Sequence, residues 1–248
     1  MLEELQTIKS ELIETISQVG ELAASAGNET LKKNLVEERL KRLETEQFNL
    51  VVLGEFNHGK TTFVNALLGK TVLPIGVTPT TAAIHHLLYG EDAKATAVHQ
   101  NGERQDVPMD ELKHYTADKD RAAETKYLEV TYPADILKNQ VVLVDTPGVN
   151  DLNLQRAEIT YSYIPRADAV LFLLDAGQIL KESERIFIDE RLLKASRDKI
   201  FFVVNKLDLL TEPEREEALE YARMNLAELV ESPTVFGVSS TMALLGEG

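Results

Sequence analysis

The sequence has 248 residues, enough for one α/β domain with a sizeable core and one additional element. It carries 41 acidic and 26 basic residues, and the resulting formal charge of −15 opposes binding to a nucleic-acid backbone or to an anionic membrane surface. The chain has no cysteine for disulfides or thiolate metal sites, no apolar run long enough to span a membrane, and an N-terminus too acidic for a signal peptide.

Residues 1–47 are predicted to form a helical segment that precedes the main domain. Apolar residues recur there at helical spacing, and three of them stand seven positions apart: Leu5, Leu12 and Val19. The stretch "AGNET" at 26–30 is expected to interrupt the helix before the apolar pattern resumes through Leu43. Two interpretations remain open, a helix packed on its own domain and a neck-like helix that needs partner helices from elsewhere.

Residues 48–248 alternate between apolar runs and charged helical stretches, which predicts an α/β fold with a mainly parallel sheet and helices on both faces. A hairpin is predicted over 95–107, with its turn at Asn101-Gly102. Strands are predicted at 48–53, 82–90, 126–133, 140–145, 167–176, 199–205 and 234–240. Helices are predicted at 60–69, 109–118, 181–196 and 213–229.

The stretch "GEFNHGKTT" lies between the first predicted strand and helix and fits a phosphate-binding loop. Glycines let backbone N–H groups close around a phosphate, Lys60 can reach the β- and γ-phosphates, and the Thr61 hydroxyl can ligate Mg²⁺. The alternative is an ordinary strand-to-helix turn. The residues predicted to bind nucleotide here are Gly54, Glu55, Phe56, Asn57, His58, Gly59, Lys60, Thr61 and Thr62.

A second motif, "DTPG", directly follows the apolar run "VVLV". Asp145 is predicted to hold Mg²⁺ through water, and the Gly148 N–H to sense a γ-phosphate, because glycine allows close backbone approach. Proline and glycine also form ordinary turns after strands, so a turn is the alternative. The loop "GVTPTTA" at 76–82 is predicted to supply a further Mg²⁺ ligand, Thr81 first and Thr80 second, with hydroxyl capping of backbone as the alternative.

A third motif, "NKLD", follows the run "FFVV" and predicts guanine recognition. The Asp208 carboxylate can accept from the two donors of guanine, a pair that adenine lacks, while the Lys206 stem lies along the base and Asn205 holds the loop. A polar turn is the alternative. In "VSS", Ser239 and Ser240 are predicted to face the guanine O6. The five motifs in this order predict a domain that binds GTP or GDP with Mg²⁺.

The order GEFNHGKT, PTTA, DTPG, NKLD resembles that of GTPases, and more narrowly the dynamin superfamily and its bacterial dynamin-like proteins, over residues 48–242. The resemblance implies GTP hydrolysis, with Lys60, Thr81, Asn57 and Gly148 as catalytic residues. It implies homodimerisation through the GTPase face, and membrane remodelling or fusion through regions absent from this chain. It also implies a cytoplasmic location at the inner face of a membrane. The chain ends where such proteins continue into helices, so a fragment is expected.

The resemblance has one departure in the phosphate loop. Relatives place a polar water-orienting residue or an arginine near the loop apex, whereas this chain has the apolar Phe56 and the neutral Asn57. Asn57 either contacts phosphate or water, or serves only an unusual backbone conformation. His58, His85 and His86 are interpreted as surface or strand residues rather than as metal ligands. Two alternative functions stay open, an Era- or septin-like switch without a membrane and a nucleotide-binding scaffold without turnover.

Overall fold

The computed structural model describes residues 2–40, 47–75, 83–112, 124–149, 160–195 and 199–246. The chain folds as two compact units, Met1–Gln47 and Phe48–Gly248. The predicted magnesium ligand Thr81, its alternative Thr80, Leu43 and residues 113–118 of one predicted helix lie outside the described residues.

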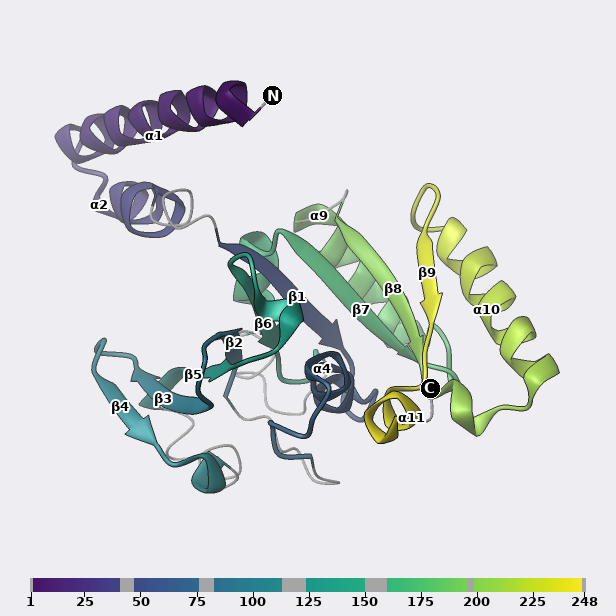
Figure 1. Ribbon diagram of the computed structural model, residues 1–248. Coiled ribbons are helices and arrows are strands. Elements are labelled where there is room, and N and C mark those ends of the chain that lie inside the picture. Colours follow the sequence, from purple (N-terminus) through teal and green to yellow (C-terminus); the bar gives the residue numbers. More distant parts are fainter. Residues whose placement is uncertain are drawn as a thin grey trace. The chain divides into compact units, whose positions relative to one another are not determined.

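The first unit contains helix α1 (Leu2–Ser25), helix α2 (Glu29–Lys32) and a π-helical segment (Lys33–Leu40) (Figure 1). The interruption expected at 26–30 is confirmed: Gly27 has a φ of 74°, and the Asn28 side chain caps α2 by accepting from the Leu31 N–H.

In the part of helix α1 whose side chains are described, the buried residues are small. Gly20 and Ala23 are buried, and a Cβ added to Gly20 would lie 2.5 Å from the Val36 Cγ2 of the π-helical segment. Glycine therefore permits this close approach. Two residues of the stripe lie outside the contact, since Leu12 is 46% exposed and Val19 is 42% exposed.

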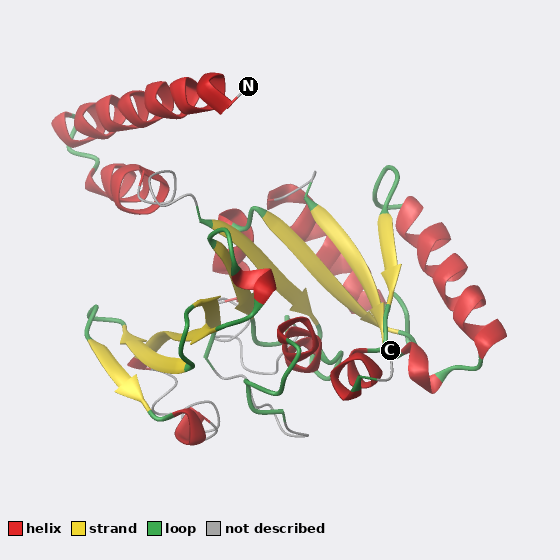
Figure 2. Ribbon diagram, viewed as in Figure 1, coloured by secondary structure: helices red, strands yellow, loops and turns green. Residues whose placement is uncertain are grey.

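The second unit is built on one sheet of nine strands in the described residues, with the order β4-β3-β5-β2-β6-β1-β7-β8-β9 (Figure 2). The strands are β1 (Phe48–Gly54), β2 (His85–Tyr89), β3 (Lys94–His99), β4 (Arg104–Val107), β5 (Thr125–Tyr132), β6 (Val141–Asp145), β7 (Ala169–Asp175), β8 (Ile200–Asn205) and β9 (Thr234–Gly237). Strand β1 pairs in parallel with β6 and β7, and β8 pairs in parallel with β7 and β9. The predicted mainly parallel sheet is confirmed there, whereas β2 runs antiparallel to β6.

Helices cover both faces of this sheet. The α-helices are α4 (Lys60–Leu68), α8 (Glu182–Phe187), α9 (Leu193–Ala195), α10 (Glu212–Ala227) and α11 (Ser240–Leu245). A π-helical stretch, Ile188–Leu192, joins α8 to α9, so the helix predicted at 181–196 forms with an altered middle turn. Short 3₁₀ turns lie at Met109–Glu111, Asp135–Leu137, Ile164–Arg166 and Leu207–Leu209.

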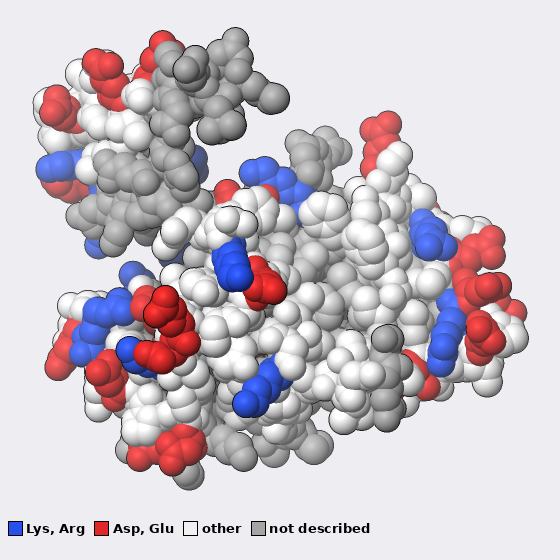
Figure 3. All heavy atoms as spheres, in the orientation of Figure 1, with Lys and Arg blue, Asp and Glu red and all other residues white. Residues whose placement is uncertain are grey.

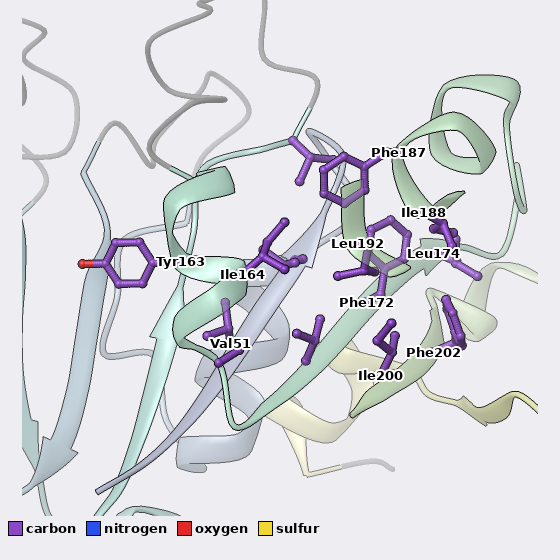
Figure 4. Packing of buried hydrophobic residues seen from close by; sticks show 14 of the residues in the cluster. Val51, Tyr163, Ile164, Phe172, Leu174, Phe187, Ile188, Leu192, Ile200 and Phe202 are labelled. Carbon is purple, nitrogen blue, oxygen red and sulfur yellow. The ribbon is translucent and has the colours of Figure 1, made fainter. Parts of the chain in front are cut away.

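Two apolar cores follow from the alternation of side chains along buried strands. Val51 and Leu53 belong to the core under α8 and α10, whereas Val52 belongs to the core under α4. Figure 4 shows the first core, where Phe172 of β7 stacks on Phe187 of α8 with ring centroids 5.8 Å apart. The central strands are therefore fixed on both faces, which holds their carboxyl ends rigidly in place.

Candidate functional site

The candidate site lies where parallel strands β1, β6, β7 and β8 end at one edge of the sheet. These ends bring together Gly54, Asp145, Asp175 and Asn205, residues far apart in the sequence. Ligands of open α/β sheets bind at such carboxyl edges. The predicted motifs thus meet at one place, although the loop 76–82 is not among the described residues.

In the predicted phosphate loop, residues 54–62, both glycines have a backbone conformation that other residues rarely adopt. Gly59 has a φ of 79°, and a Cβ there would lie 2.6 Å from the Asn205 Nδ2. Gly54 has a φ of 148°, and a Cβ there would lie 2.7 Å from the Leu173 carbonyl oxygen. Asn57 also lies in the left-handed region, with a φ of 66°. This conformation is one that asparagine tolerates, which agrees with a backbone role for Asn57.

Lys60 begins helix α4 and folds back under the loop. Its Nζ donates to the Gly54 carbonyl at 2.9 Å and to the Glu55 carbonyl at 2.7 Å. The ammonium group is thereby placed beneath the loop and beside the helix N-terminus, two features that favour an anion at this position. Thr62, the next predicted residue after Thr61, is half-buried on the same helix.

A polar cluster anchors the loop to α8, and we call it the loop bracket: the buried Glu55, His58 and Glu184, the half-buried Lys181 and the exposed Ser183. The Ser183 hydroxyl donates to Glu55 Oε1 at 2.6 Å, and the Lys181 Nζ lies 3.5 Å from Glu55 Oε2. His58 Nδ1 lies 3.2 Å from the Leu173 carbonyl oxygen and 3.3 Å from Glu184 Oε1. His58 is therefore buried, not at the surface as the sequence interpretation allowed.

Burial sets the protonation of this bracket. It raises the pKa of Glu184 to about 7, against the lowering effect of the Lys181 backbone N–H. It lowers the pKa of His58 to about 4, although the Leu173 carbonyl works in the opposite direction. Glu55, His58 and Glu184 offer ligand atoms within 4.8 Å of one another. Because the Lys181 ammonium and the Leu173 carbonyl already face Glu55 and His58, we interpret the bracket as a support for the loop.

The predicted magnesium residues Thr61 and Asp145 lie together. The Thr61 hydroxyl donates to Asp145 Oδ2 at 2.9 Å, while the buried Asp145 Oδ1 has no hydrogen-bond partner among the described residues. A hydroxyl and a carboxylate oxygen are ligands that Mg²⁺ prefers, and an unsatisfied buried oxygen agrees with a cation at this place. The residues therefore fit the metal.

The segment after Asp145 also contacts the phosphate loop. The Thr146 hydroxyl donates to the Val52 carbonyl at 2.7 Å, which fixes the turn to β1. A Cβ on Gly148 would lie 2.8 Å from the Phe56 backbone nitrogen, so only glycine permits this approach. The Phe56 side chain is 43% exposed at the loop apex.

The NKLD motif contacts the phosphate loop directly. The Asn205 Nδ2 donates to the His58 carbonyl at 2.9 Å, and the Lys206 Nζ donates to the Asn57 carbonyl at 2.6 Å. The same Nζ contacts Asp175 Oδ2 at 2.6 Å. Burial alone would raise the pKa of Asp175, but the hydrogen bonds from Lys206 and the Gly177 N–H hold it below its usual value.

The two serines of "VSS" contact the NKLD side chains. The Ser239 hydroxyl donates to Asp208 Oδ1 at 2.5 Å, and Ser240 donates to Asn205 Oδ1 through both its N–H and its hydroxyl. These contacts orient the two side chains predicted to hold the base and the loop. They place the serines behind Asn205 and Asp208, whereas direct contact of the serines with guanine stays a prediction.

Sequence reasoning missed several residues of this site: Asp175, Lys181, Ser183, Glu184 and His85. Asp175 ends β7 as Asn205 ends β8. Its position at a strand end is the sequence signal that could have predicted its place in the site. The bracket residues reach the loop only through tertiary packing, and Ser183 is 128 positions from Glu55. His85 and His86 do lie on strand β2, as expected.

Comparisons with known proteins agree with this geometry. A family model described as the Dynamin family matches residues 50–207. An uncharacterized protein in the xynA 3′ region of Caldicellulosiruptor sp. (strain Rt8B.4) is 32% identical, over 98% of this chain and 62% of its own length. A bacterial dynamin-like protein of Nostoc punctiforme (strain ATCC 29133 / PCC 73102) is 32% identical, over 94% of this chain and 37% of its own length.

A solved structure shares the fold. It belongs to an oligomerised bacterial dynamin pair and gives a TM-score of 0.64 at 24% identity, over 96% of this chain and 39% of that one. This chain spans less than two thirds of the length of both curated relatives. The family match covers more than half of the chain and includes the phosphate loop, the Asp145–Gly148 turn and Asn205-Lys206. The chain belongs to the dynamin family and is a GTPase domain of that family.

Proposed function

We propose that this domain binds GTP with Mg²⁺ at the carboxyl edge of its sheet and hydrolyses it within a dynamin-like protein that remodels or fuses membranes. The carrying observation is the hydrogen-bonded link between the phosphate loop and the NKLD motif, in which Asn205 and Lys206 donate to the carbonyls of His58 and Asn57. This link fixes the distance between a phosphate site and a base site, as recognition of one nucleotide requires.

The roles follow from position. Lys60 and the loop N–H groups face the phosphates, Gly148 lies beside the loop apex, and Asp208 accepts from the guanine donors. Thr61, Asp145 and Thr81 would hold Mg²⁺, which supplies positive charge on the β- and γ-phosphates when bound. Catalysis then rests on positioning and electrostatics, with backbone groups orienting the attacking water.

The action on membranes is supported by a relative. The bacterial dynamin pair with the matching fold is described as providing a mechanism for the long-range sensing and tethering of membranes. No helix in the described ranges combines the length and the apolar character needed to cross a bilayer. From the family membership, we further propose membrane binding through regions absent from this chain and a nucleotide-driven homodimer through its GTPase face.

Phosphate release from GTP tests the hydrolytic part of the proposal. Lys60→Ala removes a charge-assisted contact to phosphate, worth about 2 kcal/mol or more, and turnover should fall at least about thirtyfold. Lys70→Ala is the matched control, because Lys70 is an exposed lysine just beyond the same helix. Wild-type turnover by the Lys60 variant would refute the proposed site. Tight GTP binding without turnover by the unaltered protein would instead support the alternative function, a nucleotide-binding scaffold.

A further inference from the structure

A buried histidine adjoins the magnesium-binding residues. His85 begins β2, is 1% exposed and stands opposite Asp145 in the antiparallel register between β2 and β6. Its Nδ1 lies 3.6 Å from Asp145 Oδ2, which is too far for a hydrogen bond. Neither ring nitrogen of His85 has a hydrogen-bond partner in the part of the chain that the structure describes, and the same is true of Asp145 Oδ1.

These unsatisfied groups need an explanation. A buried polar group without a hydrogen-bond partner costs stability. If His85 served packing alone, an apolar side chain of similar size would therefore be more stable at this position. Asp145 Oδ2 already accepts from the Thr61 hydroxyl at 2.9 Å. Asp145 Oδ2 therefore has one donor in place, the Thr61 hydroxyl, and one potential donor, His85 Nδ1, less than 1 Å beyond hydrogen-bond distance.

We infer that His85 is a positioning residue for Asp145, and that its ring N–H donates to the carboxylate when the Thr61 hydroxyl turns to Mg²⁺. A neutral imidazole suffices, because one of its two nitrogens always carries a hydrogen. The inference rests on the proposed function, since it requires Mg²⁺ at Thr61 and Asp145. It extends that function by naming an outer-shell group, and such groups orient metal ligands and tune metal affinity.

The alternative is a histidine that only fills space between β2 and β6. The two roles differ in what a substitution changes. A space-filling residue affects nucleotide binding equally with and without Mg²⁺, whereas a positioning residue affects only the Mg²⁺-dependent part. A leucine at this position should leave the fold at least as stable, because it removes two unsatisfied nitrogens.

The test is the dissociation rate of a fluorescent GDP analogue, measured over a Mg²⁺ titration and in EDTA. His85→Leu should raise the Mg²⁺ concentration for half-maximal slowing by about tenfold, the loss typical of an outer-shell partner, with the EDTA rate within about twofold of wild type. His85→Asn should restore most of the response, because its amide nitrogen stands near the place of Nδ1. His99→Leu, on strand β3 of the same sheet, is the control histidine.

Each outcome decides the question. An unchanged Mg²⁺ response in His85→Leu, or an equal change with Mg²⁺ and with EDTA, would overturn the positioning role. Should the leucine variant fail to fold, His85→Met gives the same decision: a weakened Mg²⁺ response with an unchanged EDTA rate supports the role, and an unchanged response or an equal change with and without Mg²⁺ refutes it. If the wild-type protein binds no GDP analogue or ignores Mg²⁺, the proposed function fails and this inference falls with it.

Discussion

Glu184 is a buried carboxyl beside the phosphate loop, and its burial makes stability depend on pH. Its Oε2 accepts from the Lys181 N–H at 2.9 Å, while its Oε1 faces His58 without a hydrogen bond. Burial raises the pKa of Glu184 in the folded state to about 7, from 4.5. The contribution of this carboxyl to folding stability is therefore complete below about pH 4.5 and is lost as pH rises to about 7. His58 runs the other way, because its folded pKa of about 4 lies below 6.5 and its contribution is lost as pH falls.

We therefore predict a pH-dependent effect of Glu184→Gln on stability. The variant should gain stability relative to wild type as pH rises from about 5 to about 7, by up to about 1.4 kcal/mol per pH unit, and should stay level above pH 8. Urea unfolding at several pH values measures this difference. Glu182→Gln, an exposed neighbour on α8, is the control. A constant difference between Glu184→Gln and wild type across this range would show that the carboxyl does not titrate in the bracket.

The helices and strands were predictable wherever short-range pattern decides structure. Apolar runs such as "FNLVVL" and "KIFFVVN" form strands because both faces of the central sheet are covered, and the Asn101-Gly102 turn forms its hairpin, with Gly102 at a φ of 85°. These apolar runs do not predict whether two neighbouring strands pair in parallel or antiparallel. The antiparallel pairing of β2 with β6 is set by the whole sheet, and it alone brings His85 beside Asp145.

The site shows the same limit. Lys60, Thr61, Asp145, Asn205 and Asp208 could be proposed from the sequence because each belongs to a motif at a strand end, and their roles stay predictions. The bracket was not predictable, because Glu55 meets Ser183 and Lys181 only after β1 and β7 have paired. The local sequence around Ser183 is typical of an ordinary amphipathic helix.

At the level of elements, the exposed stripe of α1 suggests how the N-terminal unit is used. The small residue Gly20 of this helix packs against Val36. Leu12, Val19 and Leu22 remain exposed. Exposed apolar residues at heptad-like spacing are typical of a helix that packs on other helices. We propose that residues 1–47 form part of a helical neck, whose further helices lie outside this chain.

Deleting residues 1–40 tests the neck assignment. GTP affinity should stay within about twofold of the full chain, because the phosphate loop and the NKLD motif are built wholly from residues after 47. Titration of both proteins with GTP and Mg²⁺ gives the comparison, and circular dichroism of the truncated protein verifies its fold. A large loss of affinity in a folded truncated protein would contradict the assignment.

For the whole molecule, self-association is the expected route to rapid turnover. Phe56 is apolar and Asn57 carries no charge, so the described part of the phosphate loop lacks an arginine or glutamine for the attacking water. A second copy facing the nucleotide would order the loops and exclude water. Figure 3 shows basic side chains beside a group of acidic ones over α10, and the net charge of −15 makes two copies repel at long range.

We predict that GTP turnover per molecule rises with protein concentration, and that moderate salt strengthens the association by screening this repulsion. Light scattering should show a dimer with GDP and a metal fluoride, and a monomer with GDP alone. Turnover measured at two protein concentrations completes the experiment. A monomer in both states with constant turnover per molecule would rule out the facing dimer for this domain.

Every role assigned to this domain depends on a guanine-nucleotide site formed by the phosphate loop and the NKLD motif, and calorimetric titration with GTP and ATP is the decisive experiment. Asp208, oriented by the Ser239 hydroxyl, should make GTP bind far more tightly than ATP, because adenine lacks the matching pair of donors. Asp208→Asn should weaken GTP and favour xanthosine triphosphate, whose C2 carbonyl accepts a hydrogen bond where the guanine 2-amino group donates one. Equal affinity of the wild-type protein for GTP and ATP would show that the NKLD motif does not recognise guanine.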